Sequence, residues 1–85
     1  MDREQAKAVL RSNYKDLVNL ALSYVNLPVK EETVLTLRCI KRYTQEETAE
    51  KLNTSVTSVK TWEKQALNRC AEVWSGIGWI EKLMV

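Results

Sequence analysis

The sequence predicts an all-α protein, a small bundle of four to five helices that forms a single domain over residues 1–85. Three observations support this fold class. A chain of 85 residues can build one hydrophobic core but leaves no room for a second. It holds two glycines and one proline, whereas average composition would give about ten of these turn-forming residues. Apolar residues also recur at spacings of three and four along most of the chain, which is typical of amphipathic helices.

Composition excludes several classes of function. Hydrophobic residues make up 45% and charged residues 28% of the chain, which is ordinary for a globular protein. Neither an apolar run long enough to span a bilayer nor a secretory signal is found, so we expect a cytoplasmic protein with no membrane partner. Histidine is absent, and Cys39 and Cys70 lack the paired spacing of a zinc or thioredoxin-like site. We therefore expect no catalytic residue, no metal, no cofactor and no enzyme activity.

The first helix is expected over Arg3 to Val25 within an N-terminal segment of residues 1–27, with Asp2 as its N-cap. The segment from Asn26 to Pro28 ends it. The main apolar seam of this helix consists of Leu10, Tyr14, Leu17, Ala21 and Tyr24, and a second stripe contains Val18, Leu22 and Val25. A face this wide usually packs against more than one neighbour, so we favour core packing over the alternative of a dimer seam.

The second helix follows Pro28, whose fixed φ suits a helix start. Glu31 and Glu32 lie in its first turn, where acids complement the helix dipole. Its apolar positions form two stripes, one of Val34, Leu37 and Ile40 and one of Leu35 and Cys39. The last turns carry a basic cluster, Arg38, Lys41 and Arg42, and cations there also suit the dipole.

A short third helix and a long fourth helix are expected after Tyr43. Thr44 and Glu47 have the spacing of a capping box, which marks a helix start. The run Asn53-Thr54-Ser55 then predicts a tight turn, because Asn tolerates the left-handed conformation and Ser is a good N-cap. The fourth helix runs from about Val56 to Trp74, and its inner seam is Val59, Trp62, Ala66, Cys70 and Val73.

The last segment, residues 75–85, is an apolar tail with two possible arrangements. Its large side chains follow Trp74 and are Ile77, Trp79, Ile80, Leu83 and Met84. We favour a fold-back onto the first helix that completes a small core. The alternative is an exposed patch through which the protein associates with a partner.

The short helix, the tight turn and the long helix together have the pattern of a helix-turn-helix. Ala49 falls where the two helices cross closely, so a larger side chain would separate them. Such a unit projects one exposed helix rigidly enough to enter the major groove of DNA, which is about 12 Å wide. Trp62 is in the inner seam, so we interpret it as a core residue and not as a residue that stacks on bases.

The stretch from Glu32 to Cys70, ETVLTLRCIKRYTQEETAEKLNTSVTSVKTWEKQALNRC, resembles region four of bacterial sigma factors. The matched features are VLTLR before the turn, the short helix TQEETAEKL, and the continuation Glu63, Ala66 and Leu67. The resemblance implies a sigma-region-four-like helix-turn-helix over residues 28–74 that reads the −35 element of a promoter. Nothing similar to the sigma region that melts promoter DNA is found, so we expect a stand-alone regulator, as in phages and mobile elements, or half of a split sigma factor.

The resemblance also implies which residues read DNA. The recognition positions are Val56, Thr57, Ser58, Lys60 and Thr61. Val56 and Thr57 differ from the arginine or glutamate that is common there. Hydroxyl groups can bind base edges or phosphates and a valine can contact a thymine methyl group. We expect Lys60 and Lys64 to bind phosphate, with Arg38, Lys41 or Arg42 flanking the groove.

The sequence therefore favours a sequence-specific DNA-binding transcription regulator. Double-stranded DNA is the expected partner, and the resemblance adds RNA polymerase. A net charge of +2 is small for an isolated DNA-binding protein, so a partner that adds affinity is expected. A homodimer through the N-terminal helix or the apolar tail is one such arrangement. The alternative function is a protein-interaction or assembly subunit, such as a small packaging component of a phage.

Overall fold

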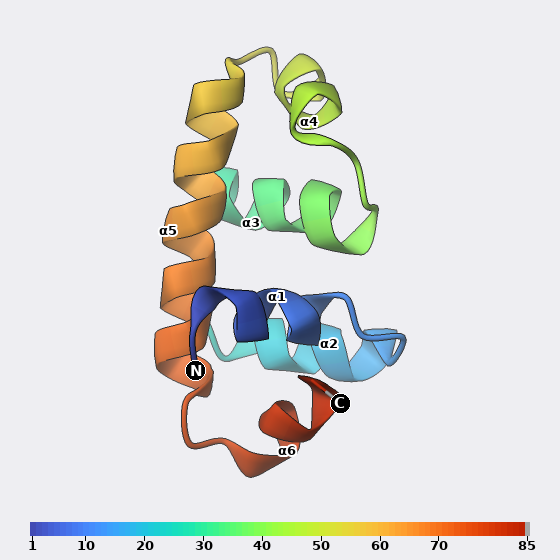
Figure 1. The fold of residues 1–85 in the computed structure, drawn as a ribbon, viewed down its shortest axis with the longest axis vertical. Helices are drawn as coiled ribbons and strands as arrows, with labels where there is room; N and C mark the ends of the chain where they lie inside the picture. Colours follow the sequence, from blue (N-terminus) through green and yellow to red (C-terminus); the bar gives the residue numbers. More distant parts are fainter. Residues whose placement is uncertain (85) are drawn as a thin grey trace.

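Helix α5 (Val56–Trp74) runs along the long axis of the molecule, and the shorter helices pack along one side of it (Figure 1). The computed structural model describes residues 1–84. The other α-helices within this range are α1 (Arg3–Leu10), α2 (Lys15–Ser23), α3 (Val29–Leu35), α4 (Gln45–Lys51) and α6 (Gly78–Glu81). A π-helical turn, η1 (Thr36–Ile40), extends α3, and a 3₁₀ turn, η2 (Lys82–Met84), follows α6. No strand occurs in this described part of the chain, which confirms the all-α class.

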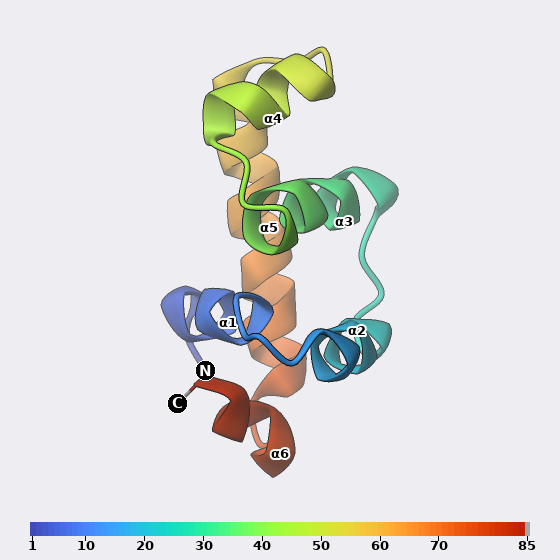
Figure 2. The same ribbon diagram turned by 90° about the vertical axis from the view of Figure 1, so that its right-hand side faces the viewer.

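The single helix expected over Arg3 to Val25 is two helices, so that prediction was wrong and the helix count rises to six within residues 1–84. Helix α1 ends at Leu10, and the hydroxyl oxygen of Ser12 accepts a hydrogen bond from the backbone N–H of Tyr14 at 3.2 Å. Serine and asparagine favour turns because their side chains compete for backbone hydrogen bonds. Figures 1 and 2 together show α1 and α2 side by side on the same side of α5, joined by a loop, an arrangement that a continuous helix could not adopt.

The break also changes which apolar residues are buried. Leu10 and Ala21 enter the core, as does the second stripe with Val18 and Val25. The other three residues of the expected seam lie on the outside of the molecule, with exposed fractions of 65% for Tyr14, 40% for Leu17 and 48% for Tyr24. Core packing is therefore wrong for these three, because the chain reverses direction between α1 and α2 and changes the register of the seam.

The main core lies where α1, α2, α3, α5 and α6 meet, around the fully buried Trp74. The indole N–H of Trp74 donates a hydrogen bond of 2.8 Å to the backbone carbonyl of Ala21, so its polar atom is satisfied inside the core. Cys39 and Cys70 are free thiols buried in the same cluster. Burial raises the pKa of the Cys70 thiol to about 12. Both thiols are therefore held neutral and act as small apolar side chains.

The inner face of α5 differs in part from the expected seam. Val59, Ala66 and Cys70 are buried as expected, whereas Val73 is 40% exposed and its place is taken by Trp74. The helix has 3.6 residues per turn, so a seam must alternate spacings of three and four, and the step after Cys70 is four. Trp62 is half-buried against a second small cluster that contains Val34, Ala49 and Val59.

The apolar tail folds back onto the first helix. Ile80 is fully buried in the main core, and Ile77, Trp79 and Leu83 pack against it. The ring of Trp79 meets Tyr24 edge to face, with 6.0 Å between the ring centroids. The start of the tail is tied further by a hydrogen bond of 2.7 Å from the amino group of Met1 to the Ser75 hydroxyl. The fold-back that the sequence favoured is therefore found; Val85 and the Met84 side chain lie outside the described residues.

In the part of the chain that the structure describes, no helix has both the length and the apolar character needed to cross a membrane.

Candidate nucleic-acid interface

Helix α4 begins in a complete capping box, as the sequence predicted. The Thr44 hydroxyl accepts from the Glu47 backbone N–H at 3.0 Å, and the Glu47 carboxylate accepts from the Thr44 backbone N–H at 2.9 Å. Hydrogen bonding to the carboxylate from the Thr44 backbone N–H, and secondarily from the Thr44 side chain, holds the pKa of Glu47 below its ordinary value, because it stabilises the ionised form. Thr48 is fully buried, and its hydroxyl donates to the Thr44 carbonyl at 2.8 Å. The start of α4 is thus fixed by hydrogen bonds between its own side chains and backbone groups.

The turn between α4 and α5 has the geometry that Asn53 and Ser55 predict. Asn53 has a φ of 52°, in the left-handed region, and the Thr54 N–H donates to the Ala49 carbonyl at 2.9 Å. The Ser55 hydroxyl caps α5 by accepting from the Ser58 N–H at 3.1 Å. Ala49 is 5% exposed at the crossing of the two helices. The α4–α5 pair is therefore a rigid helix-turn-helix that fixes the direction of α5.

The first turns of α5 present polar and cationic side chains to solvent. Thr57, Lys60, Thr61 and Lys64 are exposed. Their spacing of three and four places them on one face of the helix, opposite the side packed by Val59. The Thr61 hydroxyl donates to the Thr57 carbonyl at 3.1 Å and keeps its oxygen free to accept. This face can form hydrogen bonds and bind anions.

Two of the expected recognition residues are less accessible. Val56 is half-buried and packs against the small cluster of Val34, Ala49 and Val59. Ser58 is also half-buried, and its hydroxyl oxygen accepts a hydrogen bond from the Ser55 hydroxyl at 3.0 Å. Both therefore help to hold the start of α5, and Thr57 and Thr61 are the freer polar side chains of the face.

Trp62 lies beside this face and not on it. Its half-buried ring packs against the α3–α4–α5 cluster, and the ammonium group of Lys30 lies 5.2 Å from the ring centroid. This cation–π contact joins α3 to α5. Trp62 was predicted to be a core residue, and this is confirmed in part, because its ring packs against the cluster but is only half-buried.

Arg38, which the sequence placed among the DNA-binding residues, forms two hydrogen bonds inside the protein. Its Nε donates to the Glu63 carboxylate at 2.6 Å, and its Nη1 donates to the Tyr43 carbonyl at 2.6 Å. The side chains are only 14% and 10% exposed for Arg38 and Glu63. The guanidinium therefore ties η1 to α5 and to the segment that leads into α4, and two of its donors are used inside the protein.

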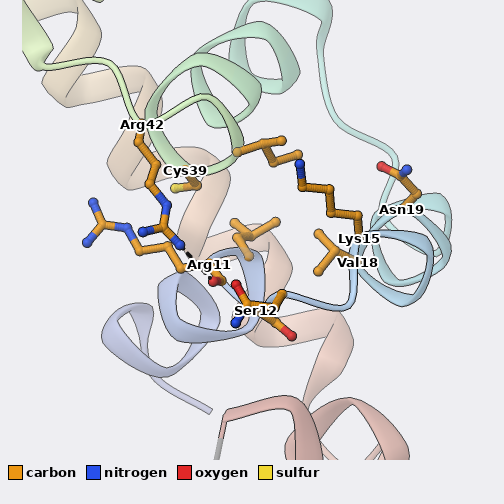
Figure 3. A pocket seen from close by; sticks show the side chains of 10 residues that line it. Arg11, Ser12, Lys15, Val18, Asn19, Cys39 and Arg42 are labelled. Atoms are coloured by element: carbon orange, nitrogen blue, oxygen red, sulfur yellow. Dashed lines mark hydrogen bonds between the residues drawn. The ribbon is translucent and has the colours of Figure 1, made fainter.

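Lys41 and Arg42 are exposed, and Arg42 lines a different pocket from Lys60 and Lys64. Figure 3 shows the Arg42 side chain extending toward the loop between α1 and α2, where its Nη2 donates to the Arg11 carbonyl at 3.2 Å. Together with Arg11 and Lys15 it lines a pocket of about 370 Å³. The residues around this pocket are not those around Lys60 and Lys64. Arg42 is therefore not among the residues that line a pocket with the two lysines of α5.

A second pocket shows which residues do accompany the two lysines. It is an open groove of about 280 Å³ between α1 and α5, lined by Arg3, Glu4, Lys7, Lys60, Glu63, Lys64 and Leu67. The α1 residues were not among the expected site residues. Arg3 and Lys7 are four apart and so share a helix face, but only the packing of α1 against α5 brings that face beside the helix-turn-helix.

Comparison with protein families gives a match to sigma-70, region 4, over residues 25–70, which is more than half of the chain. The chain belongs to this family. The match confirms the resemblance seen in the stretch from Glu32 to Cys70, and it runs through α3, η1, α4 and most of α5. Comparisons with the curated proteins and with the solved structures gave no match. Region 4 is a DNA-binding helix-turn-helix domain, so the exposed face of α5 is the candidate nucleic-acid interface of this sigma-70 region 4 protein.

Proposed function

We propose that this protein is a transcription regulator that recognises a promoter-type DNA sequence with the exposed face of α5 and acts together with RNA polymerase. The observation that carries the proposal is the exposed row Thr57, Lys60, Thr61 and Lys64 on a helix whose start is fixed by the Ser55 cap and by the crossing at Ala49. A capped and packed helix of this kind can enter the major groove without reorganising.

The chemistry of the face divides the work between two kinds of residue. The Thr57 and Thr61 hydroxyls suit hydrogen bonds to base edges, and these contacts give sequence preference. Lys60 and Lys64 suit phosphate groups, which contribute affinity and register but no sequence information. Val56 is half-buried beside the exposed face of α5, and the exposed part of its side chain can contact a thymine methyl group.

The weak overall charge supports a partner. Each phosphate contact contributes about 0.9 to the slope of log affinity against log salt, so two lysines give a shallow slope and weak binding at physiological salt. A net charge of +2 adds little long-range attraction. RNA polymerase held at the same promoter would supply the missing affinity through its own DNA contacts, because linked binding events raise the effective local concentration.

The first experiment selects bound sequences from random duplex DNA, with and without RNA polymerase. We then measure binding to the selected duplex by fluorescence anisotropy at several salt concentrations for the wild type and for Lys60→Ala/Lys64→Ala. The double variant should lower the salt slope by about 2 and weaken binding to all sequences alike. Arg11→Ala/Lys15→Ala, on the other pocket, is the charge-matched control. A folded double variant that binds like the wild type would refute the DNA face.

A second candidate function, a protein-interaction or assembly subunit, is favoured by one observation. The outer side of α2 and its flanks expose four apolar residues at helical spacing: Tyr14, Leu17, Leu20 and Tyr24. This stripe comes from a single helix of nine residues, whereas a stable interface usually buries about 800 Å² on each partner. We therefore place it second. Light scattering of the wild type and of Leu17→Lys/Leu20→Lys tests it, since an oligomer that the double variant dissociates would support this function and a monomer at high concentration would exclude self-assembly.

A further inference from the structure

We infer that helix α1 forms part of the DNA interface: Arg3 and Lys7 join Lys60 and Lys64 around one cationic groove that binds the phosphates of a DNA strand. This inference rests on the proposed function and extends it to a helix that lies before the segment matched to sigma-70, region 4.

The geometry of the groove brings two pairs of cations together. Lys60 and Lys64 are one helical turn apart on α5, and Arg3 and Lys7 are one turn apart on α1. All four side chains line the same groove of about 280 Å³. Arg3, Lys60 and Lys64 are exposed and Lys7 is half-buried, so the groove opens to solvent on the side of the exposed α5 face.

The charge balance of the groove favours an anion. Two carboxylates also line it, Glu4 and Glu63. The Glu63 carboxylate is already bound to Arg38 at 2.6 Å and is 10% exposed, so it is not available to neutralise the lysines. Four cations therefore face one free carboxylate. Within residues 1–84, none of the four cations forms an ion pair.

A phosphate strand fits this arrangement better than a single small anion. Like charges one turn apart on a helix repel each other by a few tenths of a kcal/mol, and the groove holds two such pairs side by side. A row of phosphates offers one negative charge to each cation, whereas a small anion in an open groove would meet only one or two of them. Because α1 packs directly on α5, a strand that follows the Lys60 and Lys64 side of the groove also passes Arg3 and Lys7.

The contrast with the other basic pocket sharpens the assignment. Arg11, Lys15 and Arg42 also gather around a pocket, but none of its lining residues comes from α5 (Figure 3). That pocket is therefore separated from the helix that reads bases. Its Arg11 and Lys15 provide a control of equal charge, because their loss should leave the DNA contacts of the groove unchanged.

The test measures the salt dependence of binding to the selected duplex for Arg3→Gln/Lys7→Gln, for Lys60→Ala/Lys64→Ala and for the Arg11→Ala/Lys15→Ala control. Glutamine is used in α1 because it forms helices well. We expect Arg3→Gln/Lys7→Gln to lower the salt slope by about 2 and to weaken binding to every sequence equally. Arg3→Lys/Lys7→Arg, which keeps both charges, should retain the wild-type slope.

A gain of binding provides an independent readout. Glu4→Gln removes the one free carboxylate of the groove, so it should bind the same duplex more tightly than the wild type. This result cannot arise from misfolding. Circular dichroism of each variant confirms that loss of binding is not loss of structure.

The outcomes separate the inference from the proposed function. An unchanged slope for Arg3→Gln/Lys7→Gln beside a flattened slope for Lys60→Ala/Lys64→Ala overturns the role of α1 and leaves the α5 interface standing. Unchanged slopes for both double variants overturn the inference and the proposed function together. If the α1 variant binds DNA normally but loses binding to RNA polymerase, the groove is a protein-binding site and the inference is wrong.

Discussion

Loss of the ion pair between Arg38 and Glu63 should destabilise the fold much more than loss of an exposed surface ion pair would. The pair joins η1 to α5, and the second hydrogen bond of Arg38 holds the Tyr43 carbonyl just before α4. The Nε to Oε1 distance is 2.6 Å, and the side chains are 14% and 10% exposed. Both charges are therefore largely desolvated, and each depends on the other for compensation.

The expected magnitude follows from this burial. Removing one partner of a buried ion pair costs about 3–5 kcal/mol, and the residual exposure of both side chains favours the lower end. We expect Glu63→Gln to lower the free energy of unfolding by about 3 kcal/mol. Arg38→Met should cost about 4 kcal/mol, because it also leaves the Tyr43 carbonyl without its donor. The total stability expected for a domain of this length is about 4–13 kcal/mol, so either change removes a large fraction of it.

The double variant Arg38→Met/Glu63→Met tests the mechanism. With both charges gone no buried charge is left unpaired, so it should be more stable than either single variant, at a cost of about 1 kcal/mol for the Tyr43 carbonyl. Urea unfolding followed by far-ultraviolet circular dichroism measures each free energy, and a loss of 3 kcal/mol also lowers Tm by roughly 12–24 °C. Lys60→Met, an exposed cation of the same groove, is the control and should change stability by less than about 0.5 kcal/mol. The reasoning fails if Glu63→Gln costs as little as the control, or if the two single losses simply add in the double variant.

Three further predictions concern the turn, the cap and the buried thiols. Asn53 has a φ of 52°, so Asn53→Ala should destabilise the protein by about 1 kcal/mol while Asn53→Gly is neutral or stabilising; equal urea midpoints for the two would contradict the strain argument. The pKa of Glu47 is lowered from 4.5 by its hydrogen bonds to Thr44, so the cap contributes stability above about pH 4.5 that is lost as pH falls through the lower folded pKa. The free energy of unfolding, measured from pH 3 to 7, should therefore depend less on pH for Glu47→Gln than for the wild type. An equal loss of stability at low pH in both proteins would contradict this role of Glu47. Burial raises the pKa of Cys70 to about 12. The neutral thiol therefore contributes its full share of stability below the ordinary thiol pKa of 9.0, and this contribution is lost as the pH rises toward 12. Both thiols should resist a thiol reagent at pH 8 until urea unfolds the protein, and rapid labelling of the native state would show that they are accessible.

Much of the helix-turn-helix could be predicted because its signals are local. The capping box at Thr44, the left-handed Asn53 and the Ser55 cap each depend on residues within three or four positions of one another, and each is found in the structure. The exposed face of α5 also follows from helical periodicity. Backbone hydrogen bonding within a single turn of chain determines all of these features, so the sequence expresses them directly.

Other parts of the site could not be predicted because they depend on partners far away in the sequence. Arg38 was expected to bind phosphate, but Glu63, 25 positions later, makes it an internal anchor. Glu31 suits the helix dipole by position, yet it is 5% exposed and pairs with Arg69 at 2.9 Å. The charge of a residue is visible in the sequence, whereas whether that charge is free or paired is decided by packing.

The sequence by itself determined the helical class, the helix-turn-helix and the residues of α5 that face outward, since helix periodicity and capping act over one or two turns of chain. Only the tertiary structure decided that α1 and α2 pack separately against the core and that α1 crosses α5 beside Lys60 and Lys64. The physical reason is that burial of Trp74 and its neighbours rewards contacts between distant segments, which add to the local turn tendency at Ser12. The cationic groove between α1 and α5 is therefore a property of the fold, and the two pairs of basic residues that form it are separated by more than 50 positions in the chain.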